Sequence, residues 1–176
     1  INEKIEFQNH KILLNFDKDI LNLNGSGDLS LQDEKDKIQY KIIKNKYDLI
    51  ADLKLEILKN TMNIDFFNYQ KNKSSNLEIK IALKNTHKGN LTFKKIVLKE
   101  DKNYIDINNL TVKNKKILKL DSINMDFLDK ENLKNVFQIK KKGKNYALSG
   151  DIFNANKFIN DSLNSNNKIN IFEDNF

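Results

Sequence analysis

Few side chains in this sequence are spaced in a way that would support catalysis or metal binding. His10 and His87 fall in polar stretches that predict turns, and neither has a second histidine or a paired carboxylate at ligand spacing. The acidic residues fall on the polar faces of predicted strands or in turns, where a solvated carboxylate is the default. No phosphate-binding glycine loop or nucleophile elbow occurs. We therefore predict a non-enzymatic protein with no metal and no cofactor.

A basic cluster is the other pattern that suggests a binding partner. Lys140, Lys141, Lys142 and Lys144 surround Gly143 in a chain of net charge +7. The cluster spans a predicted hairpin turn, has no interleaved aromatic residues and includes no arginine for bidentate contacts. We expect solvated lysines that protect a turn or a sheet edge, and no nucleic acid partner. Contact with an anionic membrane surface is a further interpretation.

The composition indicates one folded domain. The chain has 176 residues, of which 39% are hydrophobic and 31% charged, and it contains no cysteine, so disulfides and Cys-based zinc sites are excluded. No apolar run approaches the roughly 18 residues that a spanning helix needs. The sequence begins at Ile1 without an initiator methionine. We expect a segment of a longer protein, with any signal peptide or anchor outside it.

Apolar residues alternate with polar ones along most of the chain, which predicts strands with one apolar face. Short polar clusters separate these runs every 10 to 14 residues or so, a spacing typical of an antiparallel meander. The longest apolar stripes occupy odd positions in two predicted strands. Their members are Tyr47, Leu49, Leu53, Leu55 and Ile57 in the first strand, and Leu77, Ile79, Ile81 and Leu83 in the second.

Several positions interrupt the alternation. Gly25 and Gly27 lie in mid-strand on the apolar face, where glycine marks a bend, a bulge or a close approach of another chain segment. The apolar phase slips by one residue at 108–109 and again at 121–122. Since a one-residue slip would turn every later side chain to the other face, each slip predicts a bulge or a tight turn.

Only one stretch has helical periodicity. Residues 154–163 place Ala155, Phe158, Ile159 and Leu163 on one side, with Asn154 as N-cap. We expect a short helix there that packs on one end of the sheet through Phe158. Residues 1–165 then form one β-segment, and residues 166–176 are a linker or the start of a further strand.

The predicted strands outnumber what one short helix can cover. Either the sheet closes on itself as a sandwich or barrel, or it stays open as a curved trough whose apolar floor is covered by a partner. Lipid acyl chains are the simplest long apolar ligand. We favour an all-β fold, mostly an antiparallel meander with one short C-terminal helix, in the form of a long, curved, open, groove-like sheet.

The stretch from Tyr146 to Leu163 resembles a recurring pattern of the AsmA-like bacterial envelope proteins of the YhdP and TamB kind. In that pattern a strand ending in Gly-x-x-Phe-Asp-Ala leads into a short helix ending in paired leucines, which here corresponds to Gly150-Asp-Ile-Phe-Asn-Ala155. This chain has Asn154 in place of the aspartate and Ser162-Leu163 in place of the leucine pair. The resemblance covers roughly residues 20–165.

The resemblance implies a function in lipid transfer without catalysis. AsmA-like proteins are bridge-like lipid transfer proteins, anchored in the inner membrane and extending through the periplasm of Gram-negative bacteria as an apolar β-groove. This chain would be one length of a phospholipid conduit between the inner and outer membranes. Its partners would be phospholipid acyl chains, the inner membrane through an anchor outside this segment, and outer-membrane or periplasmic proteins.

Two alternatives share the same strand pattern. One is a structural or adhesive all-β sandwich whose apolar face is its core, and the other is a soluble carrier of lipid or lipoprotein. A closed sandwich interdigitates side chains of mixed size, whereas a trough needs a continuous apolar stripe across successive strands. The nine odd-numbered residues above are the predicted floor of that trough, and Gly25, Gly27, Gly150 and Phe158 are its predicted structural positions.

Overall fold

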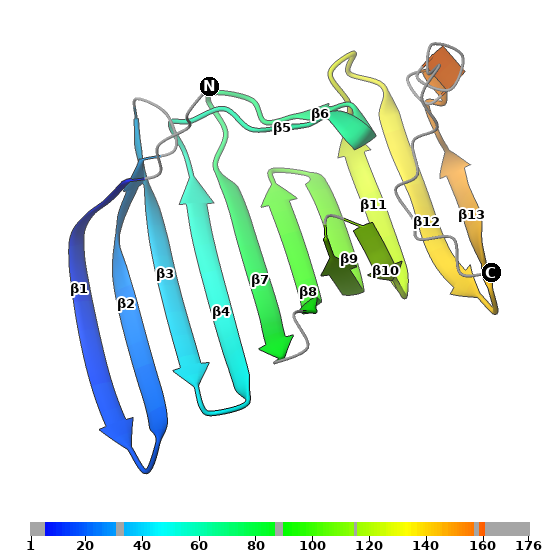
Figure 1. Ribbon diagram of the computed structural model, residues 1–176. Helices are drawn as coiled ribbons and strands as arrows, with labels where there is room; N and C mark the ends of the chain where they lie inside the picture. Colours follow the sequence, from blue (N-terminus) through cyan, green and yellow to red (C-terminus); the bar gives the residue numbers. More distant parts are fainter. Residues whose placement is uncertain (1–5, 31–33, 87–89, 115, 157–158, 161–176) are drawn as a thin grey trace.

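One large antiparallel sheet makes up most of the chain (Figure 1). The computed structural model describes residues 6–30, 34–86, 90–114, 116–156 and 159–160. The main sheet has 11 strands. They are β1 (Glu6–Asp17), β2 (Ile20–Ser30), β3 (Lys35–Lys44), β4 (Asp48–Ile57), β7 (Leu77–Thr86), β8 (Leu91–Glu100), β9 (Asn103–Lys113), β10 (Lys116–Lys119), β11 (Ser122–Leu128), β12 (Lys134–Lys142) and β13 (Asn145–Ile152).

The strands follow one another in space almost as they do in sequence. Their order is β1-β2-β3-β4-β7-β8-β9-β11-β12-β13, with β10 paired to the end of β9, and every pairing is antiparallel. The predicted all-β antiparallel meander is therefore confirmed. In the described part of the chain the order runs from one edge, β1, to the other, β13, without closing.

The strand registers align the apolar residues across the whole sheet. Each of the ten strands in that order contributes one residue to a row of paired residues, here called the central row. Every residue of the central row except one glycine is apolar. Its members are Ile12, Gly25, Tyr40, Leu53, Ile81, Ile96, Ile107, Ile123, Ile139 and Leu148. Because successive side chains alternate between faces, the sequence neighbours of this row, most of them polar or charged, lie on the opposite face.

A crossing segment interrupts the meander between β4 and β7. Residues 58–76, here called the strap, contain β5 (Asn63–Ile64), the 3₁₀ turn η1 (Asp65–Phe67) and β6 (Tyr69–Gln70). In Figure 1 the strap runs over the upper ends of the central strands, from β4 toward β11. The sequence predicted only short polar clusters between the apolar runs, so the strap as a cover is a feature that the alternation did not show.

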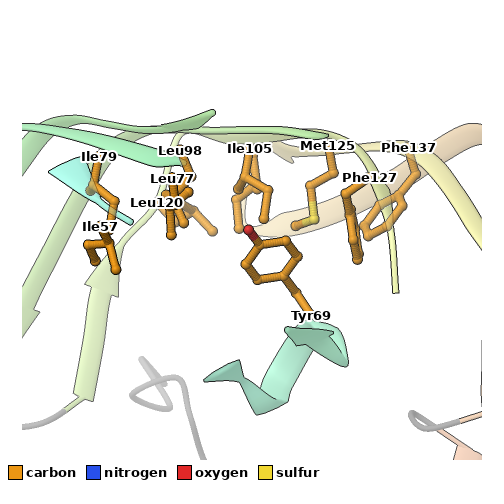
Figure 2. Close-up of a cluster of buried hydrophobic side chains, with 11 residues drawn as sticks. Ile57, Tyr69, Leu77, Ile79, Leu98, Ile105, Leu120, Met125, Phe127 and Phe137 are labelled. Carbon is orange, nitrogen blue, oxygen red and sulfur yellow. The ribbon is translucent and has the colours of Figure 1, made fainter. Parts of the chain in front are cut away.

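The hydrophobic core lies between the strap and the sheet. Figure 2 shows Tyr69 of the strap pointing toward side chains of the central strands. Tyr69 is 1% exposed, and its ring meets that of Phe127 edge-to-face at a centroid distance of 6.0 Å. The buried cluster consists of Ile57, Tyr69, Leu77, Ile79, Leu98, Ile105, Leu120, Ile123, Met125, Phe127 and Phe137.

Both predicted phase slips correspond to irregular backbone. At the first slip the residues on either side, Asn108 and Leu110, pair with Lys95 and Phe93, while Asn109 between them has a left-handed φ of 51°. At the second slip β10 ends at Lys119 and β11 begins at Ser122, so two strands replace one. The irregularities restore the apolar residues to one face, as the pattern required.

The predicted turn at His10 is wrong. This residue lies within β1, where a register shift between Gln8 and Lys11 accommodates it. The predicted helix 154–163 is not seen among the described residues, because residue 157, Phe158 and residues 161–163 lie outside them, as do His87 and the whole of 166–176. At its start, Asn154 Oδ1 accepts the N–H of Asn156 at 3.1 Å, the bond expected of an N-cap, and Ala155 O accepts the N–H of Ile159 at 2.8 Å.

Candidate apolar binding face

The nine predicted floor residues divide into three groups. Ile57, Leu77 and Ile79 are buried in the core beneath the strap, with exposed fractions of 2%, 0% and 6%. Tyr47 precedes β4 and is 63% exposed. The remaining five lie on the apolar face of β4 and β7 and are partly buried: Leu49, Leu53, Leu55, Ile81 and Leu83. Register pairs Leu53 with Ile81 and Leu55 with Ile79, so the two predicted stripes do share a face.

The apolar face is wider than the two predicted stripes. Tyr40 and Ile42 of β3 pair with Leu53 and Ala51, and Ile96 of β8 pairs with Ile81, so the stripe continues in both directions. These residues show the same alternation as the predicted floor, but the sequence does not reveal which strands are neighbours. The structure therefore extends the candidate site from two strands to the whole width of the sheet.

The strap is fastened to the sheet through a buried carboxylate, Glu100, which is 2% exposed. Glu100 accepts hydrogen bonds from the Tyr69 hydroxyl at 2.6 Å, the Asn72 N–H at 2.8 Å and the Ser75 hydroxyl, which are all strap groups. Burial alone would raise the pKa of Glu100, but the hydrogen bonds outweigh it and lower that pKa below the ordinary value. Burial, together with this carboxylate, raises the pKa of Tyr69.

A second carboxylate, Asp36 of β3, holds the first residues of the strap. Its side chain is buried and accepts the backbone N–H groups of Leu58 at 2.7 Å and Lys59 at 2.9 Å. Asn60 donates its side-chain amide to the same carboxylate at 2.7 Å. Burial raises the pKa of Asp36, and these donors more than offset the effect, so the pKa is lowered overall. Asp36 and Glu100 are thus structural acids, contrary to the expectation of solvated carboxylates.

The glycines on the apolar face make room for neighbouring groups. A Cβ at Gly25 would lie 2.3 Å from the Tyr40 ring, and one at Gly27 would lie 2.3 Å from the His10 ring. His10 also stacks on Tyr40, and its ring nitrogens lie 3.0 Å from the Tyr40 hydroxyl and 3.0 Å from the Asp28 carbonyl oxygen. Two rings therefore fill the gap that the glycines leave in the apolar stripe.

Gly150 has a different neighbour. A Cβ there would lie 2.3 Å from the backbone oxygen of Val136, where the pairing of β12 and β13 shifts register. The close approach is therefore to backbone at Gly150, and to side chains at Gly25 and Gly27. Phe153, just beyond β13, packs edge-to-face on Phe137 at 4.8 Å between centroids.

The opposite face of the sheet is polar and carries several ion pairs. Lys54 lies 2.6 Å from Glu56 and 3.1 Å from Glu78, and Lys80 lies 2.8 Å from Glu78. A hollow of about 880 Å³ opens on this face. Most of its lining belongs to the polar face, including Lys11, Asn24, Gln39, Lys54, Lys80 and Lys95. Since three of its lysines are paired with carboxylates, the hollow does not present a concentrated positive charge.

The described residues offer little other chemistry. No group of three or more histidine and acidic side chains in them could hold a metal ion. Among the same residues, no helix is both long and apolar enough to pass through a bilayer. The lysine cluster flanks the β12–β13 turn as predicted, with Gly143 at a left-handed φ of 61°.

No family model, curated protein or solved structure matches the chain. Function must therefore be inferred from the molecule's own features: an apolar row that crosses the entire sheet, a strap that covers part of it, and two sheet edges.

Proposed function

We propose that this chain binds lipid acyl chains on the apolar face of its sheet and has no catalytic role. The observation that carries the proposal is the central row, in which apolar side chains follow one another from β1 to β13. Nine inter-strand steps of about 4.8 Å give a path on the order of 40 Å, longer than the roughly 30 Å hydrocarbon core of a bilayer.

The uneven cover of this path supports binding over a purely structural role. The strap buries Leu77 and Ile79, whereas Leu53 and Ile81 in the next row are only partly buried. At the ends of the central row Ile12 and Leu148 are each 53% exposed. A contiguous apolar patch that stays exposed to water typically marks a surface that binds a partner.

The proposed mechanism is passive. Each methylene group moved from water to an apolar surface contributes about 0.8 kcal/mol, so leaving one acyl chain bare in water would cost on the order of 10 kcal/mol. The apolar face replaces the bilayer interior for the acyl chains, while the head groups remain in water. Because the row is continuous across strands, a lipid can move along it without leaving apolar contact.

The biological setting is a further part of the proposal. The resemblance to AsmA-like proteins supports a position in the periplasm, where this chain would form one length of a phospholipid path between the inner and outer membranes. In that setting a sheet with two edges can be continued by further strands, and an anchor outside this segment would hold the protein to the inner membrane.

The test is photo-crosslinking at two register pairs of the same two strands. A photoreactive phenylalanine replaces Leu53 or Ile81 on the apolar face, and Lys54 or Lys80 serves as the matched control on the polar face. Ile81 is preferred to the more deeply buried Ile79. The variants are mixed with phosphatidylethanolamine–phosphatidylglycerol vesicles, irradiated, and analysed for lipid adducts by mass spectrometry.

We expect adducts at 53 and 81 and none at 54 and 80. Adducts at 54 and 80 alone would move the lipid to the polar hollow and overturn the proposed face. No adduct at any position, in a protein that also fails to fold with Leu53→Asp, would instead favour the structural or adhesive module. In that outcome Leu53 would be a core residue whose partners lie outside the described segments.

A further inference from the structure

The outer edge of β1 is an unusually open pairing surface. Among the described residues no strand pairs with its outer side. Ile12, Leu13, Leu14 and Phe16 are 53%, 69%, 61% and 70% exposed. Natural sheet edges are commonly blunted by proline, lysine or bulges. The chain has no proline, and residues 11–17 contain a single lysine, Lys11.

The regular part of this edge has well-defined limits. It begins after the bulge between Gln8 and Lys11, where Asn9 has a φ of 52°, and it ends at Asp17 before the turn formed by Lys18 and Asp19. A partner strand can therefore pair without interruption only with residues 11–17.

The backbone groups available on this edge follow from the β1–β2 hairpin. Asp17 pairs with Ile20 across a two-residue turn, which makes it a hydrogen-bonded pair. In an antiparallel ladder such pairs alternate, so Asp17, Asn15 and Leu13 direct their N–H and C=O groups toward β2. The corresponding groups of Ile12, Leu14 and Phe16 point outward, to the open edge.

We propose that β1 pairs with β1 of a second copy of this chain, antiparallel and centred on Leu14. This register places each outward-pointing residue opposite another: Leu14 faces Leu14, and Ile12 faces Phe16. It also pairs all of residues 11–17 with the same residues of the second copy. Registers centred one residue away run into the bulge or into the turn.

The charges of the edge fit the same register. Lys11 and Asp17 come opposite each other twice, once at each end of the paired stretch, and both lie on the polar face. They form non-hydrogen-bonded pairs, in which cross-strand side chains approach most closely and opposite charges are stabilising. Ile12, Leu14 and Phe16 share the apolar face, so the apolar rows of the two copies would join across the interface. The inference rests on edge geometry and charge, and not on lipid binding.

The first test measures the oligomeric state of the 176-residue chain by analytical ultracentrifugation. We expect a dimer. Lys11→Asp should weaken it on the order of tenfold, because two attractive pairs become repulsive. The double variant Lys11→Asp/Asp17→Lys should restore it, since each residue then meets the complementary charge of the other copy. Leu148→Lys, on the opposite edge, is the control and should leave the dimer intact.

The second test reports the register directly, and it is clean because the chain has no cysteine. Lys11→Cys and Asp17→Cys are prepared separately, checked for unchanged circular dichroism, and oxidised alone or as a mixture. In the proposed register, position 11 meets position 17, whereas two copies of position 11 lie about 20 Å apart at roughly 3.4 Å per residue. The mixture should form disulfide-linked dimers and the separate variants should not.

Several outcomes would overturn the proposal. A chain that sediments as a monomer at every concentration up to its solubility limit would exclude the dimer. A dimer that Leu148→Lys disrupts and Lys11→Asp does not would place the contact at β13. Crosslinking of the separate variants as readily as of the mixture would exclude the register, and capture of a different strand at β1 would show another occupant.

Discussion

The same alternating pattern gives buried apolar residues at the centre of this sheet and exposed ones at its margin. At the centre, beneath the strap, Leu77 and Ile105 are 0% and 1% exposed. At the margin, in the β1–β2 hairpin, Leu14 and Phe16 on the same face are 61% and 70% exposed. Alternation therefore specifies which face is apolar, and a separate segment decides how much of that face is buried.

The polar groups of the two regions differ in a related way. The centre contains two buried carboxylates, Asp36 and Glu100, whose hydrogen bonds fix the strap over the apolar face. At the margin no strap is present among the described residues, and His10 and Tyr40 lie over glycines to fill the surface. The centre is thus built as a core, and the margin as an accessible apolar surface.

The largest expected effect comes from deleting apolar atoms at the centre. Leu77→Ala should lower the free energy of unfolding by about 2–5 kcal/mol, the range for a buried leucine that leaves a cavity. Leu148→Ala, on the same face at the β13 edge, should cost less than about 1 kcal/mol because its side chain is already half exposed. Urea denaturation of both variants measures the difference. Equal losses would mean that the margin is buried as deeply as the centre.

The strap should respond to acid. The pKa values of Asp36 and Glu100 are lowered from ordinary values of 3.8 and 4.5, so their contribution to stability is complete above those values. It is lost as the pH falls through the lower pKa values of the folded state, because protons then bind the unfolded chain more tightly. The protection of the amides of residues 69–72, relative to their intrinsic exchange rates, should therefore fall below about pH 4, ahead of that of β2 and β3 residues near the open margin.

A variant separates this effect from general acid unfolding. Glu100→Ala leaves the Tyr69 hydroxyl and the Asn72 N–H without their acceptor, and each such loss costs about 1–3 kcal/mol. The variant should show low amide protection in the strap already at neutral pH, with little further loss of protection in acid. If its strap remains protected at neutral pH, Glu100 does not fasten the strap.

The sequence predicted most strands of the main sheet and both phase slips because each depends on local backbone geometry. The alternation at Leu53 and at Ile81 could be recognised separately, but it did not show that these two residues pair with each other across neighbouring strands. The strap could not be predicted in the same way. Glu100 lies 31 residues from Tyr69 and 25 from Ser75, and nothing local indicates that a hydroxyl in one polar stretch binds a carboxylate at the end of a later strand.

The histidine and the glycines illustrate the same limit. A polar stretch around His10 predicted a turn, but a bulge keeps this residue in β1, where its ring covers Gly27. The sequence did indicate that Gly25 and Gly27 need space. It did not indicate that aromatic side chains from β1 and β3 occupy that space.

The margin can be tested through this contact. Gly27→Val should lower the free energy of unfolding by about 1–3 kcal/mol, since the new side chain overlaps the His10 ring. In the double variant with His10→Ala, much of the loss should be recovered. Gly143→Asn is the control, because asparagine tolerates the left-handed φ and no neighbouring atom lies within 4 Å of its Cβ. Additive losses in the double variant would contradict the steric explanation.

The smallest expected effect lies on the polar face of the centre. Glu78 forms ion pairs with Lys54 and Lys80. Both lysines lower the pKa of Glu78, and Lys80 has the larger effect. Exposed ion pairs contribute little, so Glu78→Gln should cost less than about 1 kcal/mol at low salt. At about 1 M salt the Debye length falls to roughly 3 Å and the difference from the parent should largely disappear.

Glu131→Gln, which removes the same charge in the turn before β12, should be neutral at both salt concentrations. If Glu78→Gln instead costs as much as Leu77→Ala, the ion pairs of the polar face stabilise the centre as strongly as its apolar core, and the contrast between centre and margin cannot be assigned to the strap alone.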